Sequence, residues 1–127
     1  MPKLTVHRVR FSKEADSRLK TLKTKTGITP NLLCRIGFCL SLEEPGIPSP
    51  ERYPDGPREI NRYTLTGEFD EAFEALLLQR LVRDGVPEDR LDEQFKAHMN
   101  RGVDLLSARV RNLGDLASLI PIVGSVQ

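Results

Sequence analysis

The sequence lacks most of the residue patterns that mark an active site. It has only two histidines, His7 and His98, and neither stands at metal-ligand spacing from the other or from a cysteine. It contains no glycine-rich phosphate loop, no nucleophile-elbow motif and no zinc-binding signature. We therefore expect a non-enzymatic protein with no catalytic residues, no bound metal and no cofactor.

Cysteine and long apolar runs are scarce as well. Cys34 and Cys39 are five residues apart in a predicted helix, which turns them about 140° away from each other. We expect buried free thiols there and no disulfide. No run approaches the roughly 18 apolar residues of a membrane span, and no signal segment opens the sequence. These absences predict a cytoplasmic protein without a membrane span, and 127 residues predict one domain.

What the sequence does have is an uneven distribution of charge. Residues 1–40 contain nine Lys or Arg and two acidic residues, a net charge of +7. Residues 41–127 contain ten basic and sixteen acidic residues, a net charge of −6. A basic end beside an acidic remainder is typical of a chain that binds a polyanion with one part and other proteins with the other.

The basic end predicts a strand followed by a helix. Residues 4–11 alternate in the manner of a short strand, with Arg8 and Arg10 on the same side. Ser12 is placed as the N-cap of a helix over about residues 13–26. A β-ribbon and a helix would then present the basic side chains together.

A second helix should follow directly. Gly27 ends the first helix, and Thr29 with Pro30 restarts the chain as a helix over about residues 30–42. We expect its inner face to combine Leu32, Leu33, Ile36, Cys39 and Leu40. Further apolar side chains point the other way, which predicts either an oligomer or tight packing against the C-terminal half.

The rest of the chain predicts a proline-rich connector and a helical body. Five prolines in residues 43–62 exclude a continuous helix, so we expect an extended link between a basic head (1–42) and an acidic helical body (63–127). The whole forms one compact, mainly α domain.

Two long helices and a short one are predicted in the body. The first begins at Thr66 or Gly67 and ends near Gly85, with an inner stripe of Phe69, Ala72, Phe73, Leu76, Leu77 and Leu81. The second begins at Pro87, with an inner stripe of Leu91, Phe95, Met99, Val103, Leu106 and Val110. Gly102 interrupts that stripe and indicates a close helix contact or a bend. A final turn near residues 115–120 should precede a loose tail.

The basic side chains of the first helix gather on one side. On a helical wheel Lys13, Lys20 and Lys23 fall within about 80° of one another, opposite the apolar stripe, and Arg18 and Lys25 form a second flank. Lysines suit contact with phosphate, and the two strand arginines could also reach base edges. An ordinary solvated helix face is the alternative for any single lysine. The net charge of the segment favours a polyanion partner.

The order of strand, helix, Gly-Ile-Thr-Pro turn and helix over residues 4–42 resembles the ribbon-helix-helix DNA-binding proteins. In that family the strands of two chains pair, and the ribbon enters the major groove. A mainly α fold with a ribbon-helix-helix-like N-terminal part is what this resemblance implies.

A more specific resemblance covers nearly the whole chain. Its segments are RLKTLK from Arg18, TGITPN from Thr26, CLSLEEPG from Cys39, NRYTLTGE from Asn61 and HMNRG from His98. In this order they resemble the DndE family of the DNA phosphorothioation (DNA sulfur modification) system. In that system a cysteine desulfurase, an iron-sulfur ATP-pyrophosphatase-like protein and an ATPase replace a non-bridging phosphate oxygen with sulfur.

The resemblance implies a homotetramer that binds double-stranded DNA, preferentially nicked, through lysines of its first helix. The best-matching positions are Lys13, Lys20 and Lys23, with Lys25 and Arg18 as additions. Other DNA sulfur-modification proteins are the implied partners. Two alternatives stay open at this point: a structural adaptor that docks these partners on its acidic helices (70–104), and a ribbon-helix-helix transcriptional repressor.

Overall fold

Two long helices cross at the centre of the molecule. In the computed structural model, which describes residues 2–119, α5 (Leu91–Arg109) packs along α2 (Pro30–Glu43) more extensively than any other pair of elements. Each helix carries a glycine at the crossing. A Cβ atom added to Gly102 would lie 2.3 Å from the carbonyl carbon and oxygen of Gly37. Of the two alternatives predicted for Gly102, a close helix contact or a bend, the structure shows the close contact.

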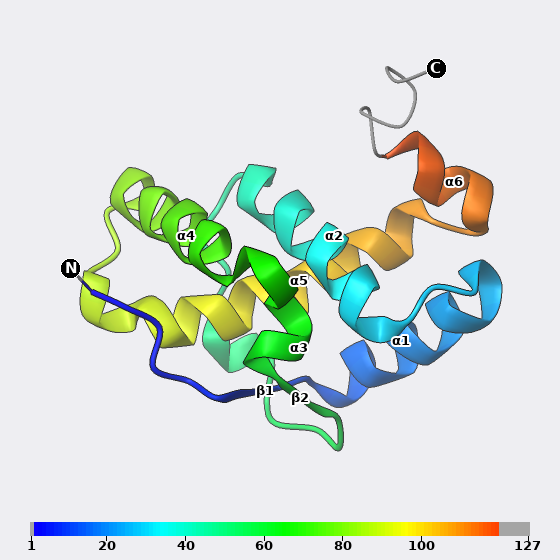
Figure 1. Cartoon of the computed structure of the whole chain (residues 1–127), viewed down its shortest axis with the longest axis horizontal. Helices are drawn as coiled ribbons and strands as arrows, with labels where there is room; N and C mark the ends of the chain where they lie inside the picture. Colours follow the sequence, from blue (N-terminus) through cyan, green and yellow to red (C-terminus); the bar gives the residue numbers. More distant parts are fainter. Residues whose placement is uncertain (1, 120–127) are drawn as a thin grey trace.

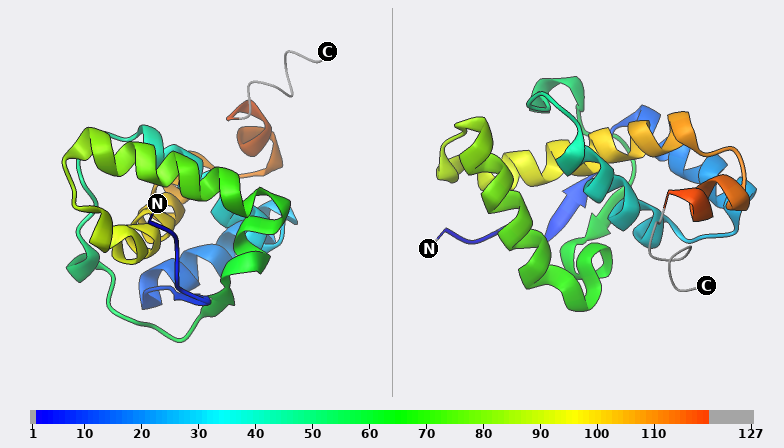
Figure 2. Two further views of the ribbon diagram at one scale, coloured as in Figure 1. Left: turned by 60° about the vertical axis from the view of Figure 1, so that its left-hand side comes forward. Right: turned by 90° about the horizontal axis from the view of Figure 1, so that it is seen from above.

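The remaining helices surround this pair (Figure 1). Helix α4 (Asp70–Asp84) lies toward the start of α5, whereas α1 (Lys13–Thr26) and α6 (Leu113–Ser118) lie toward its end, as Figure 2 shows from two further directions. The shorter helical elements are α3 (Arg62–Thr66), η1 (Pro50–Arg52), η2 (Gly67–Phe69) and η3 (Glu88–Arg90). Within residues 2–119, none of the helices has the length and apolar character that a membrane crossing needs.

The core is built on the apolar stripe of α5. All six side chains predicted for it are buried: Leu91, Phe95, Met99, Val103, Leu106 and Val110. Phe38 of α2 stacks on Phe73 of α4, with ring centroids 5.1 Å apart, and meets Phe95 edge-on at 5.6 Å. One aromatic cluster therefore joins α2, α4 and α5, and the mainly α fold with a single core is as predicted.

The inward face of α2 differs in part from the one predicted. Leu33 is buried as predicted, and Ile36 and Leu40 are partly buried, but the other fully buried apolar side chains are Cys34 and Phe38. Leu32 is 40% exposed and the Cys39 residue is also exposed. The expectation of two buried thiols is correct for Cys34 and wrong for Cys39. The glycine crossing fixes the rotation of α2, and the helical period alone could not choose between its two apolar faces.

The helix predicted from Thr66 or Gly67 to Gly85 is interrupted. Gly67 has a φ of 58°, and the chain passes through η2 before α4 begins at Asp70. The buried side chains of α4 are Phe73, Leu77, Arg80 and Leu81. Phe69, Ala72 and Leu76 are exposed, so their inward assignment is wrong. The break places Phe69 before α4, whereas Ala72 and Leu76 lie within α4 beside a buried stripe that is narrower than predicted.

The proline-rich segment does more than connect. It contains strand β2 (Glu59–Asn61), which pairs antiparallel with β1 (Arg8–Arg10) so that Val9 lies opposite Ile60. The ribbon therefore forms within one chain, unlike the two-chain ribbon of the ribbon-helix-helix proteins. β1 is also shorter than the predicted strand over residues 4–11. Helix α6 begins two residues before the predicted turn, and the tail beyond Pro121 lies outside the described residues.

Candidate nucleic-acid interface

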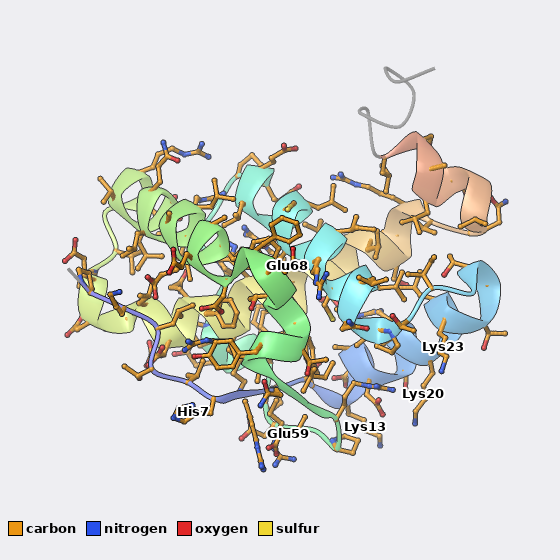
Figure 3. The ribbon with its side chains drawn as sticks, viewed as in Figure 1. His7, Lys13, Lys20, Lys23, Glu59 and Glu68 are labelled. Carbon is orange, nitrogen blue, oxygen red and sulfur yellow. The ribbon has the colours of Figure 1, made fainter. Side chains whose placement is uncertain are left out.

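Helix α1 presents its lysines to solvent. The Ser12 side chain accepts a hydrogen bond from the Ala15 N–H at 3.1 Å, and the helix ends at Gly27 in the left-handed region, as predicted. Leu19 and Leu22 are buried against the core. The opposite side carries exposed lysines, namely Lys13, Lys20 and Lys23, and Lys25 is exposed on the flank that it shares with Arg18. Figure 3 shows the first three along one edge of the molecule.

One carboxylate lies within this lysine face, which we define as Lys13, Lys20, Lys23 and Lys25. Asp16 Oδ2 is 3.2 Å from Lys20 Nζ, and Asp16 Oδ1 accepts a hydrogen bond from Arg58 Nε at 2.7 Å. Burial alone would raise the pKa of Asp16, but the hydrogen bonds from Arg58 and Lys20 outweigh it and hold the pKa below its usual value. Asp16 is therefore ionised at neutral pH. In the part of the chain that the structure describes, the other three lysines make no salt bridge.

The arginines predicted for the same surface are all paired. Arg18 forms a salt bridge with Asp104 of α5. Arg8 and Arg10 both bind the carboxylate of Glu59 on the neighbouring strand. The structure thus divides the predicted site residues into lysines that are mostly unpaired and arginines that form ion pairs with carboxylates. A lysine face of this kind can attract phosphate at long range without a specific geometry.

A second polar cluster lies in the core and was not predicted. Ser41 Oγ is 2.8 Å from His98 Nδ1 and accepts a hydrogen bond from Arg101 Nε at 2.8 Å. Arg101 and Arg80 also donate to the Gly46 carbonyl oxygen, at 2.8 and 2.7 Å. These bonds join the end of α2 to α4 and α5. The sequence feature that could have indicated this cluster is the position of Arg80 within the buried stripe of α4. A buried cation there needs hydrogen-bond acceptors around it.

The cluster holds its histidine in the neutral form. His98 is fully buried, and burial, with the positive charges of Arg101 and Arg80 nearby, lowers the pKa of its imidazole to about 3. Its Nε2 has no hydrogen-bond partner among the residues that the structure describes. An imidazole that is closed off from solvent and bound to a hydroxyl serves to hold helices together. Among residues 2–119, no three His, Cys, Asp or Glu side chains are grouped so that they could hold a metal ion.

The outer face of α2 forms an apolar hollow. One part, of about 470 Å³, is lined mainly by Ile36, Cys39, Leu40, Phe69 and Phe73. A second part, of about 400 Å³, continues toward α6 along Leu32 and Ile36. Three of the nearby apolar side chains are at least 40% exposed: Leu32, Phe69 and Leu113. Such a contiguous apolar surface is typical of a site that contacts another protein.

Comparison with known proteins agrees with the sequence resemblance. The family model for DNA sulphur modification protein DndE matches residues 8–112. The sequence of this chain is 30% identical to that of DndE from Escherichia coli B7A, a protein of known crystal structure involved in DNA phosphorothioation modification. The two structures match with a TM-score of 0.65 over 82% of this chain and 99% of that one. A DndE mutant involved in DNA phosphorothioation is 29% identical with a TM-score of 0.63, covering 81% and 99%. No curated protein matches this chain. With its strand, paired helices and central α5 all inside the matched region, the chain belongs to the DndE family of DNA sulphur modification proteins.

Proposed function

We propose that this DndE-family protein is a non-enzymatic component of DNA phosphorothioation that binds the backbone of duplex DNA through α1. The observation that carries the proposal is the lysine face, where Lys13, Lys23 and Lys25 are exposed and carry no ion pair within the described residues. Lysines without a fixed geometry neutralise phosphates of any sequence by releasing counterions. The polar cluster around His98 supports a structural role for the residues that could otherwise suggest chemistry.

A nicked duplex suits this surface better than an intact one. The lysine face is fixed to a helix that packs against the core, so the DNA must adapt to the protein. A nick lowers the energy of bending, and more phosphates can then reach the lysines at a lower deformation cost. We infer a preference for nicked DNA, and a role in holding a strand break while sulfur is inserted.

The test is a binding series with purified protein and three matched DNAs: intact duplex, nicked duplex and single strand. We expect nicked duplex to bind most tightly, and the logarithm of affinity to fall with the logarithm of salt with a slope of about −3 for three phosphate contacts. Replacing Lys20 and Lys23 together by alanine should reduce that slope by about one, because Lys23 is unpaired whereas Lys20 is already paired with Asp16. Lys3→Ala removes an exposed lysine that lies beside Glu71 and Glu74, and serves as the matched control.

Either of two results would contradict the proposal. Binding that does not change with salt would exclude phosphate contact as its main source. A K20A/K23A protein that binds like the wild type would exclude the lysine face. In cells, full phosphorothioation by the same double variant would refute the strand-holding role.

We also propose that the protein assembles as a homotetramer through the apolar hollow of α2. Leu32 and Phe69 lie at that surface with 40% and 55% exposure, and a second copy would remove them from water. Assembly would place several lysine faces on one DNA. Light scattering should give the mass of four chains for the wild type and a lower mass for Leu32→Asp, while Val82→Asp, at a 70% exposed position on α4, should leave the mass unchanged.

A structural adaptor is the second candidate function. Glu71, Glu88, Asp89 and Glu93 are exposed near the start of α4 and α5, and none forms a salt bridge within residues 2–119. This acidic end could contact basic surfaces of the other sulfur-modification proteins. Charge reversal there should abolish pull-down of those proteins without changing DNA affinity. Strong preference for one operator sequence over random duplex would instead support a repressor.

A further inference from the structure

The two arginines of β1 share one carboxylate. Arg8 and Arg10 are two residues apart on the strand and therefore point to the same side of the ribbon. Arg8 Nη1 donates to Glu59 Oε1 at 3.1 Å, and Arg10 Nη2 donates to Glu59 Oε2. Glu59 stands directly opposite Arg10 in the strand register. Each carboxylate oxygen is thus bound by a different guanidinium group.

This arginine pair adjoins the lysine face. Arg10 also donates to the carbonyl oxygen of Gly56 at 3.1 Å. Gly56 packs so closely on the start of α1 that a Cβ atom there would lie 2.5 Å from the Lys13 backbone nitrogen. Figure 3 shows Glu59 and Lys13 on the same edge of the molecule. A DNA backbone that follows the lysine face would therefore meet the arginine pair next.

Two guanidinium groups around one anion with two oxygens is an arrangement that binds phosphate as well as carboxylate. We propose that Arg8 and Arg10 form a phosphate-binding pair, and that Glu59 is a specificity-determining residue that occupies it in the free protein. The inference rests on the proposed function, because the phosphate belongs to DNA held by the lysine face. Any duplex that binds the ribbon must first displace the Glu59 carboxylate. Glu59 therefore weakens the binding of DNA that does not place a phosphate against Arg8 and Arg10.

The exposure of these side chains allows such an exchange. The side chain of Arg8 is 72% exposed, that of Arg10 40% and that of Glu59 27%. Ion pairs at this level of exposure contribute little to stability. A phosphate can therefore replace the carboxylate without unfolding the ribbon, and a neutral residue at this position should be tolerated.

The experiment compares intact-duplex binding by the wild type, Glu59→Gln and Glu14→Gln at two salt concentrations. Glu14 is an exposed acid in the first turn of α1 that binds no arginine in the described chain, so its variant removes the same unit of charge. We expect Glu59→Gln to tighten binding about fivefold, with a salt slope steeper by roughly one. Adding Arg8→Gln and Arg10→Gln to Glu59→Gln should abolish that gain.

The outcomes separate this inference from the proposed function. Equal tightening by Glu59→Gln and Glu14→Gln, or a gain that survives loss of both arginines, would overturn the role of Glu59 while leaving the lysine face intact. If K20A/K23A binds like the wild type, the lysine face fails regardless of what Glu59→Gln does. If no variant binds DNA, both proposals are overturned. If Glu59→Gln unfolds at the same temperature as the wild type, its change in DNA affinity does not come from a change in stability.

Discussion

The burial of His98 should make the protein lose stability in mild acid. Its imidazole has an ordinary pKa of 6.5, which applies to the unfolded chain, whereas burial lowers the pKa in the folded protein to about 3. Below pH 6.5 the unfolded state therefore takes up a proton that the folded state does not. Stability from this residue is fully present above pH 6.5 and is lost as the pH falls toward 3.

The magnitude follows from the two pKa values. At pH 5 the unfolded imidazole is almost entirely protonated and the folded one is almost entirely neutral, so linkage gives a loss of about 2 kcal/mol between pH 7 and pH 5. This is a large fraction of the roughly 5–15 kcal/mol that stabilises a typical domain. The nearby Arg101 and Arg80 contribute to this loss, because their positive charges also disfavour a protonated imidazole in the folded protein.

Urea unfolding followed by circular dichroism at pH 7, 6 and 5 provides the assay. His98→Asn removes the titrating group but keeps a polar side chain near Ser41, so its stability should fall about 2 kcal/mol less than that of the wild type between pH 7 and pH 5. His7→Asn, which changes the other histidine at an exposed position, is the control and should behave like the wild type. If His98→Asn and the wild type lose equal stability, the argument from a buried neutral imidazole is refuted.

Three further predictions concern the packing that positions the interface, and all are measured by urea unfolding at pH 7. Gly102→Ala should destabilise the protein by at least about 3 kcal/mol because the added methyl group meets the Gly37 backbone; a cost near zero would mean that the helices do not cross so closely. Ser12→Ala should cost about 1 kcal/mol through loss of the α1 cap, and a neutral result would contradict that hydrogen bond. Arg80→Met should cost about 3–5 kcal/mol because it leaves Asp84 and the Leu42 carbonyl without their buried partner; a stabilised variant would show that the arginine is dispensable.

Features that depend on residues close together in the sequence could be predicted from it. The bounds of α1, the stripe of α5 and the close contact at Gly102 all follow from capping residues, period and composition within one segment. The buried face of α2 could not be predicted, because two faces are apolar and the glycine crossing with α5 decides between them. The role of residues 59–61 as a strand could not be predicted either, since a three-residue pair depends on a partner about fifty residues away.

The same division holds for the candidate interface. Exposure of the lysines follows from the period of α1, but pairing of the arginines depends on the fold: Arg8 and Arg10 meet Glu59, and Arg18 meets Asp104. The net charge of +7 in residues 1–40 therefore overstates the charge that is open to a ligand, because Glu59 and Asp104 from the second part of the chain cancel two of those positive charges. What remains unpaired in this part of the described structure is largely lysine. Lysine is a mobile point charge that contacts phosphate without reading bases, whereas arginine can do both. Folding thus engages the arginines, which are best suited to sequence recognition, in ion pairs with carboxylates, and leaves unpaired the lysines, which are suited to binding a backbone of any sequence.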